Sequence, residues 1–171
     1  MPRISYVNGR FIRHSHAAVH IEDRGYQFAD AIYEVIAIVR GRMIDEELHF
    51  ERLERPFSAA VFRIKVAELL RLNRVSGGAL YLQVSRGVAP RTHMIPGEMQ
   101  SSVVMTLRPL RGVPADVVEK GVPIITVPDI RWQRPDIKSV ALLPNVLAKD
   151  DAVQQNVYEA WLVNDKGIVT E

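Results

Sequence analysis

The pattern of apolar and polar residues predicts strands in the first part of the chain. Apolar residues flank Asn8-Gly9, a pair favoured in two-residue turns, so residues 4–12 are expected to form a hairpin. The segment 32–39 is almost continuously apolar, which is typical of a strand buried on both faces. Leucine and valine alternate with more polar residues over 79–85, which predicts a half-buried strand, and another strand is expected at 102–107.

Helices are expected between these strands. Asp45 can cap a helix whose first turn carries two glutamates, the charge preferred near a helix N-terminus. Pro56 should kink or end that helix, because proline lacks the backbone donor that a helix interior needs. A second helix is predicted over residues 66–72 and is expected to end at Gly77-Gly78.

A proline- and glycine-rich stretch, residues 109–114, is the best candidate for a linker. It separates an expected N-terminal domain, residues 1–110, from a second domain over residues 114–171. The second domain is expected to contain helices and strands over residues 115–120, 122–127, 129–132, 142–155 and 158–163. This mixture indicates an α+β chain with an N-terminal α/β domain. A last strand begins at Ile168-Val169 and stops at once, so we expect a truncated chain, with the first domain complete and the second only begun.

Composition narrows the classes of protein to which the chain can belong. Of its 171 residues, 47% are apolar and 25% are charged, which is ordinary for a globular protein and argues against disorder. The absence of cysteine excludes disulfides, thiolate zinc sites and a thiol nucleophile. The net charge of +2, from scattered basic residues, does not favour nucleic acid as a partner. The sequence has neither a long apolar run nor the apolar core of a signal peptide, so no membrane partner and a cytoplasmic location are expected.

Three segments carry more polar or particular residues than packing requires. Residues 23–30 concentrate charges, a glycine and aromatics before the apolar strand, although a surface connection can have the same composition. The side chains of Arg91 and His93 can converge on one carboxylate, or lie in a solvated loop. Lys138 has apolar neighbours that favour a neutral, nucleophilic amine, whereas most lysines extend to solvent. The histidines near the N-terminus lack a well-placed carboxylate, so no metal site is expected.

These segments belong to an ordered set of motifs. The motifs are EDRGYQFADAIYEV at residues 22–35, PRTH at 90–93, DIRW at 129–132 and DIKS at 136–139. Together they resemble the fold-type IV pyridoxal-phosphate enzymes, and within that class the D-amino-acid aminotransferases. The first motif is similar to the N-terminal signature of the class, the second to the arginine-x-histidine loop of the subgroup, and the last two to the segment around its cofactor lysine. Shorter matches extend the resemblance over nearly the whole chain, at residues 146–149, 158–160 and 169–171.

The resemblance implies a two-domain fold-type IV aminotransferase architecture and pyridoxal 5'-phosphate as the cofactor. Lys138 would hold the cofactor as a Schiff base and, once freed by a substrate, would move the proton between the substrate Cα and the cofactor. Glu171 matches the carboxylate that pairs with the pyridine nitrogen and so keeps the ring an electron sink. Arg52 matches the arginine that contacts the cofactor phosphate.

The resemblance also implies the substrates and a partner. Tyr33, Arg91 and His93 would hold the α-carboxylate of the substrate. In the family the arginine and histidine come from the other subunit, so a homodimer is implied. The reaction would move the amino group of a D-amino acid, such as D-alanine, to a 2-oxo acid acceptor such as 2-oxoglutarate.

The chain departs from the family pattern at several small positions. Ala29 and Ala31 stand where the signature commonly has glycine, which narrows the room for the backbone. Ala141 and Pro144 stand where close relatives carry asparagine and glycine, which bears on local geometry and substrate range.

Other readings of the same residues remain open. Branched-chain aminotransferases and aminodeoxychorismate lyases share the lysine and part of the signature, but the Arg91-x-His93 motif favours the D-amino-acid subgroup. An R-selective amine transaminase is an alternative if the carboxylate site is not used. An inactive fragment that acts as a binding or interaction module would instead leave Lys138 as an ordinary exposed amine.

Overall fold

The computed structural model describes residues 3–53, 58–110 and 112–171, and the chain divides into two compact units. The first unit comprises Met1–Arg111 together with Ile137–Val140, and the second comprises Gly112–Asp136 and Ala141–Glu171. The short segment Ile137–Val140, which carries Lys138, therefore belongs to the first unit although it lies far beyond it in the sequence.

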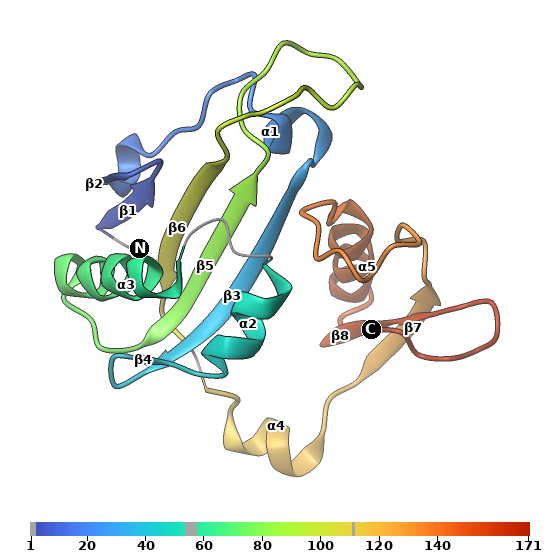
Figure 1. The fold of residues 1–171 in the computed structure, drawn as a ribbon. Helices are drawn as coiled ribbons and strands as arrows, with labels where there is room; N and C mark the ends of the chain where they lie inside the picture. The colour runs from blue at the N-terminus through green and yellow to red at the C-terminus, as the bar shows by residue number, and fades with distance from the viewer. Residues whose placement is uncertain (1–2, 54–57, 111) are drawn as a thin grey trace. The chain divides into compact units, whose positions relative to one another are not determined.

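The first unit is built on a six-stranded antiparallel sheet (Figure 1). In sheet order the strands are β2 (Arg10–Arg13), β1 (Ile4–Val7), β6 (Ser102–Arg108), β5 (Gly78–Ser85), β3 (Ala31–Val39) and β4 (Arg42–Met43). The hairpin predicted around Asn8-Gly9 is confirmed, with Val7 paired to Arg10 across the turn. Both turn residues have positive φ, at 45° and 90°, as such a turn requires. The strands predicted in β3, β5 and β6 are also confirmed.

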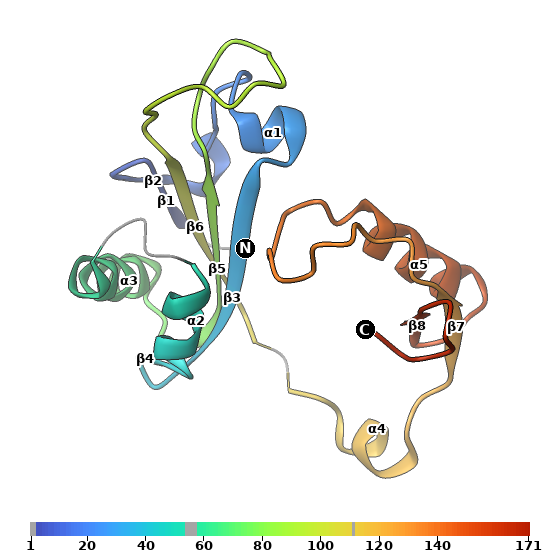
Figure 2. The same ribbon diagram turned by 45° about the vertical axis from the view of Figure 1, so that its right-hand side comes forward.

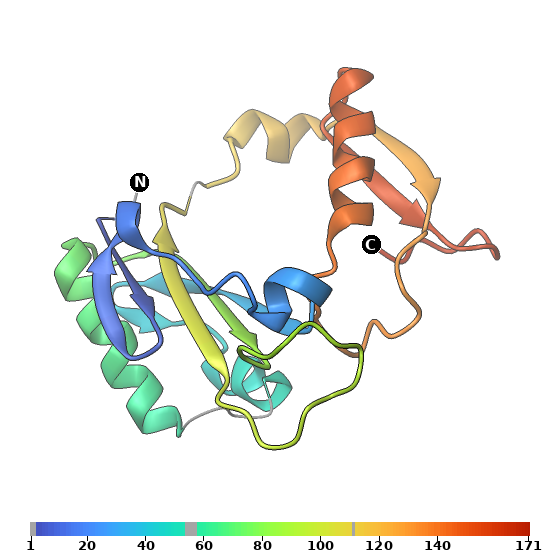
Figure 3. The ribbon, with the colours of Figure 1, turned by 90° about the horizontal axis from the view of Figure 1, so that it is seen from above.

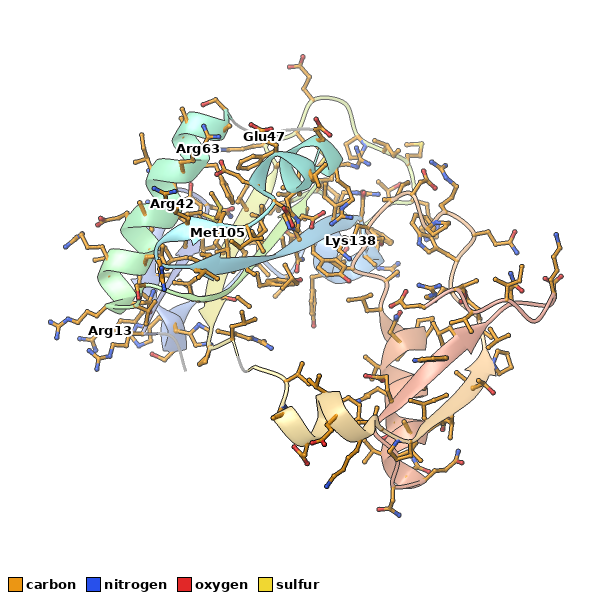
Figure 4. All side chains as sticks on the ribbon, turned by 90° about the horizontal axis from the view of Figure 1, so that it is seen from below. Arg13, Arg42, Glu47, Arg63, Met105 and Lys138 are labelled. Atoms are coloured by element: carbon orange, nitrogen blue, oxygen red, sulfur yellow. The ribbon has the colours of Figure 1, made fainter. Side chains whose placement is uncertain are left out.

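Two helices cover one face of this sheet, α2 (Glu46–Arg52) and α3 (Ala59–Asn73) (Figure 2). A 3-10 turn, η1 (His14–His16), follows the hairpin, and the short helix α1 (Arg24–Phe28) precedes β3. Phe62 and Leu69 of α3 are fully buried against Leu80 and Leu82 of β5, and Met105, labelled in Figure 4, completes the contact from β6. This apolar layer supports β3, the strand on which the candidate site depends.

The burial of β3 differs from the expectation. Ile36 and Ile38 face the helices and are buried, but Val35 and Val39 on the other face are each 48% exposed. The strand is therefore buried on one face within the described residues, and the expectation of two buried faces was wrong. In a continuously apolar strand both faces carry apolar side chains, so the sequence does not show which face packs against the core.

The two helices also begin and end differently from the sequence expectation. Asp45 precedes α2 as predicted, but it has a φ of 51° and its side chain makes no capping bond. The second helix starts earlier than residue 66, because the Ser58 hydroxyl accepts from Val61 N and caps α3. It ends at Asn73, where Arg74 caps it in the left-handed conformation, rather than at Gly77-Gly78. Pro56 lies outside the described residues.

The second unit contains α4 (Ala115–Lys120), β7 (Ile124–Pro128), α5 (Leu143–Gln154) and β8 (Glu159–Val163). The strands β7 and β8 pair in parallel, and α5 packs against them (Figure 3). The strand expected at 129–132 was wrong, because Asp129 bonds locally to Arg131 and turns the chain. Val169 makes an isolated antiparallel bridge to Val163. Within the described ranges, no helix has the length and apolar character needed to cross a membrane.

Ala29 ends α1 in the left-handed conformation, at φ 55° and ψ 24°. A β-carbon is unfavourable there, so Ala29→Gly is expected to raise the free energy of unfolding by about 0.5–1 kcal/mol in urea titration. Ala37→Gly in β3 is the matched control, and it should lower stability because an extended residue gains nothing from glycine. Equal losses in both variants would contradict the assignment of strain to Ala29.

Candidate functional site

Lys138 lies on a short segment that pairs with the beginning of β3 (Figure 4). Tyr33 N donates to the Lys138 carbonyl over 3.0 Å, and Val140 N donates to the Ala31 carbonyl over 3.1 Å. These two bonds hold the backbone from the Lys138 carbonyl to Val140 against a strand of the sheet. Because its backbone is held by the sheet, the Lys138 side chain extends from a fixed position, which a catalytic group requires.

The Lys138 amine extends over the aromatic face of Tyr33. Its Nζ lies 4.6 Å from the ring centroid of Tyr33. The Tyr33 ring in turn stacks on Tyr81 with centroids 5.9 Å apart, and Tyr81 donates to Gln83 over 2.7 Å. Burial, together with the neighbouring Tyr33, raises the pKa of the Tyr81 phenol, so this donor remains protonated at neutral pH. The sheet thus brings two of the predicted site residues, Lys138 and Tyr33, into direct contact.

Glu34 holds Arg52 from the opposite face of β3, since successive residues of a strand point to opposite sides. Its carboxylate is 1% exposed and accepts from Arg52 Nε and from Arg52 Nη2, the latter over 2.6 Å. The second carboxylate oxygen also contacts His49 Nδ1 at 2.7 Å. Arg52 therefore has a bidentate partner, and its third nitrogen, Nη1, remains outside this pair.

The charge balance of this cluster explains how a carboxylate is tolerated in an apolar layer. Burial by itself would raise the pKa of Glu34, but hydrogen bonds and charge from Arg52 and His49 outweigh it and lower the pKa below its ordinary value. Glu34 stays ionised and keeps the Arg52 guanidinium in place. Sequence reasoning missed Glu34 and His49, although a lone acidic residue inside the apolar run 32–39 was a visible signal.

Arg91 and His93 lie on the loop between β5 and β6, where both contact Phe28 of α1. The Arg91 guanidinium carbon is 5.2 Å from the ring centroid of Phe28, and the His93 ring meets the same ring edge-on at 5.6 Å. Among the described residues, no hydrogen bond or ring contact joins this pair to Tyr33 or Lys138. The three residues expected to hold a substrate carboxylate are therefore not brought together by these contacts.

The segment 23–30, which precedes β3, begins with three buried residues, whereas Tyr26 is 74% exposed and the remaining residues are half-buried. Asp23 and Arg24 are 2% and 4% exposed, and Asp23 caps α1 by accepting from Gly25 N over 2.8 Å. A β-carbon on Gly25 would lie 2.8 Å from the Ser85 side chain, so only glycine fits at this contact. The family signature thus includes residues that pack α1 against the end of β5.

Glu171 belongs to a separate polar cluster in the second unit. Its carboxylate pairs with Arg131 and accepts from Asn145 Nδ2 over 2.7 Å. Arg131 also donates to both oxygens of Asp129, over 2.9 Å and 2.8 Å, and Thr170 donates to Asp129 over 2.6 Å. The hydrogen bond from Arg131 is the main cause that holds the pKa of Asp129 well below its usual range. Arg131, to which sequence reasoning assigned no role, thereby orients Glu171.

These side chains fit the chemistry of pyridoxal phosphate. The amine of Lys138 suits its aldehyde, the Nη1 of Arg52 suits its phosphate, and the carboxylate of Glu171 suits its pyridine nitrogen. Glu171 already has two partners, but a carboxylate has about four acceptor positions and can take another donor. Among the described residues, no group of three or more histidines and carboxylates is arranged to hold a metal ion.

Solved structures share this fold. The branched-chain amino acid aminotransferase of Escherichia coli aligns with a TM-score of 0.85 at 16% identity, over 100% of this chain and 62% of that one. A hypothetical aminotransferase of Mycobacterium tuberculosis, in its PLP-bound form, aligns with a TM-score of 0.72 at 21% identity, over 97% of this chain and 63% of that one. At such low identity these likenesses concern the fold alone, and they confirm the predicted α+β, fold-type IV aminotransferase class.

Sequence comparison is more specific than the fold. A D-alanine aminotransferase of Staphylococcus haemolyticus is 42% identical over 164 residues, which are 91% of this chain and 58% of that protein. The chain thus spans less than two thirds of the length of this relative, and the resemblance to the D-amino-acid aminotransferases is confirmed. Residues 31–171 match the amino-transferase class IV family, and the chain belongs to that family.

Proposed function

We propose that this protein transfers the amino group of a D-amino acid, such as D-alanine, to a 2-oxo acid such as 2-oxoglutarate, with pyridoxal phosphate as its cofactor. The observation that carries the proposal is Lys138, whose backbone is bonded to β3 and whose amine lies over Tyr33. The identity to a D-alanine aminotransferase supports the choice of substrate. A cytoplasmic location is part of the same proposal.

Lys138 has two tasks in this proposal. Its amine would hold the cofactor through the aldehyde and, when free, would carry the proton to and from the substrate Cα. The chemistry that the bound cofactor supplies is an electron sink for the charge that develops at this carbon. Tyr33, in contact with the amine, limits the directions from which Lys138 reaches the substrate.

Arg52 and Glu171 are assigned by the resemblance to two other groups of the cofactor. Arg52 would donate to the phosphate, and its bidentate bond to Glu34 keeps the guanidinium oriented. Glu171 would accept from the protonated pyridine nitrogen, and its pairing with Arg131 orients the carboxylate. The roles of Lys138, Arg52 and Glu171 thus cover an aldehyde, a phosphate and a ring nitrogen.

The substrate carboxylate is assigned to Tyr33 of one subunit and to Arg91 and His93 of a second copy of the chain. A homodimer is supported by the apolar tip of the loop that carries this pair. Met94 and Ile95 are adjacent in the chain and are 75% and 67% exposed, so this loop offers apolar side chains that a second subunit can cover.

The test is a visible absorbance titration of the purified protein with pyridoxal phosphate, followed by D-alanine, with L-alanine as the control. Because Lys138 binds the cofactor covalently, a visible band should form on addition of pyridoxal phosphate and should be bleached by D-alanine alone. Bleaching by L-alanine instead would overturn the D-amino-acid assignment and leave only the cofactor class. No band at all would overturn the proposed function for this chain.

A further inference from the structure

The loop between β5 and β6 is attached to α1 by bonds to one buried arginine. Arg24 is 4% exposed, and its Nη1 donates to the Thr92 carbonyl over 2.8 Å and to the Met94 carbonyl over 3.4 Å. These two carbonyls belong to the residues on either side of His93. The loop runs beside α1 in Figures 1 and 3, as these bonds require.

The orientation of Arg24 is set by Asp30. Arg24 Nε donates to Asp30 Oδ2 over 2.8 Å, and Arg86 Nε donates to the same oxygen over 2.8 Å. The Arg24 backbone is fixed as well, because its N–H donates to the Gly87 carbonyl over 2.9 Å. With one edge of the guanidinium held by a carboxylate, the other edge points at the loop carbonyls.

The ring of Phe28 lies between the guanidinium of Arg24 and the side chains of Arg91 and His93. The guanidinium carbons of Arg24 and Arg91 lie 4.9 Å and 5.2 Å from the centroid of the Phe28 ring. The His93 ring meets Phe28 edge-on, with the centroids 5.6 Å apart. Arg24 therefore fixes the backbone around His93, and Phe28 fixes the side chains of Arg91 and His93.

We propose that Arg24 and Phe28, here together called the platform, are positioning residues for carboxylate recognition by Arg91 and His93. Neither platform residue needs to touch the substrate, since each acts through the loop. The inference rests on the proposed function, because it takes Arg91 and His93 as the groups that bind the substrate carboxylate. Without these contacts the loop would often hold Arg91 and His93 apart. Substrate binding would then be weakened by the free energy needed to order the loop.

The experiment compares Arg24→Lys with the matched control Arg86→Gln in the cofactor-loaded protein. Lysine keeps the charge beside Asp30 but cannot bond to a carboxylate and to two carbonyls as the planar guanidinium does. Arg86→Gln removes the other arginine of Asp30 without touching the loop carbonyls around His93. The rate of bleaching of the cofactor band is measured against D-alanine concentration, which separates half-saturation from maximal rate.

In Arg24→Lys the half-saturating D-alanine concentration is expected to rise about 10-fold, with the maximal rate and the cofactor band within about 2-fold of the unmodified protein. Arg86→Gln should leave the half-saturating concentration close to its original value. Without cofactor or substrate, trypsin should cut after Arg91 faster in Arg24→Lys, because the released loop opens more often. If Arg24→Lys does not fold, Phe28→Leu, at a half-buried position, is expected to give the same rise in half-saturation.

Unchanged half-saturation in the folded variants would overturn the platform. A lost cofactor band in a stably folded Arg24→Lys protein would also overturn it, since the residue would then serve the cofactor. If the unmodified protein itself forms a band that D-alanine bleaches, these results bear on the platform alone. If the unmodified protein gives no such response, the proposed function fails first and the platform fails with it.

Discussion

Lys138→Ala is expected to abolish the visible band formed with pyridoxal phosphate and to lower transamination of D-alanine by about 10³-fold or more. The substitution removes both the amine that binds the cofactor and the base that moves the Cα proton, so cofactor binding and proton transfer are lost together. Its effect on folding should be small, because the pairing of residues 137–140 with β3 uses backbone bonds from Tyr33 N and Val140 N, which alanine leaves in place. The measurements are the absorbance titration and the rate of pyruvate formation from D-alanine.

The matched control is Lys120→Ala at an exposed position at the end of α4, which should retain the band and the rate. A second control, addition of a small primary amine to Lys138→Ala, asks whether an external base restores part of the proton transfer. A full-strength band in Lys138→Ala would mean that another lysine binds the aldehyde, and the assignment of Lys138 would fall.

Arg52→Met is expected to lower the free energy of unfolding by about 2 kcal/mol at neutral pH. Removing one partner of a fully buried ion pair typically costs roughly 3–5 kcal/mol, but Arg52 is 48% exposed and His49 remains beside Glu34, so a smaller loss applies. The cost arises because Glu34, at 1% exposure, must either stay charged without its main partner or take up a proton. Urea titration of the two proteins measures the difference.

The same pair makes stability depend on pH on the acid side. The folded-state pKa of Glu34 lies below its ordinary value of 4.5, so between the two values the unfolded chain binds more protons than the folded one. This contribution is therefore fully present above about pH 4.5 and is lost as the pH falls through the lower, folded-state pKa. In Arg52→Met the loss of stability at acid pH should be smaller, because burial still raises the pKa of Glu34 while the main group that lowers it is gone.

Arg71→Met on α3 is the control for Arg52→Met. Arg71 makes the same two-nitrogen contact with Glu68, over 2.7 Å for each bond, but this pair lies on the surface. Water screens such a pair, so the substitution should leave the free energy of unfolding nearly unchanged. Equal losses for Arg52→Met and Arg71→Met would contradict the importance given to burial of Glu34.

Local patterns were sufficient for elements whose signals lie within a few residues. The turn pair Asn8-Gly9 predicted the first hairpin, because only residues that tolerate positive φ close such a turn. The alternation over β5 predicted its half-buried character, and α5 was predicted within one residue at each end. The start of α3 was missed, because its cap at Ser58 lies well before the apolar periodicity becomes clear.

For the candidate site, the sequence predicted which residues take part but not which of them touch one another. The motifs around Lys138 and Arg91 named the residues, but nothing in the sequence showed that Lys138 would lie on Tyr33 or that Arg91 and His93 would contact Phe28 instead. Such contacts join positions far apart in the chain, and the pairing of strands and helices decides them. Propensity and spacing act over one or two turns and carry no information at that range.

The sequence by itself determined the family, the α+β class, the main strands of the first sheet and the identity of the candidate catalytic lysine. Only the tertiary structure decided which face of β3 is buried, that Glu34 on that face anchors Arg52, and that Arg24 holds the loop around His93. The physical reason is the same in each case. A buried charge is stable only beside its partner, and folding, which brings distant segments together, is what supplies that partner.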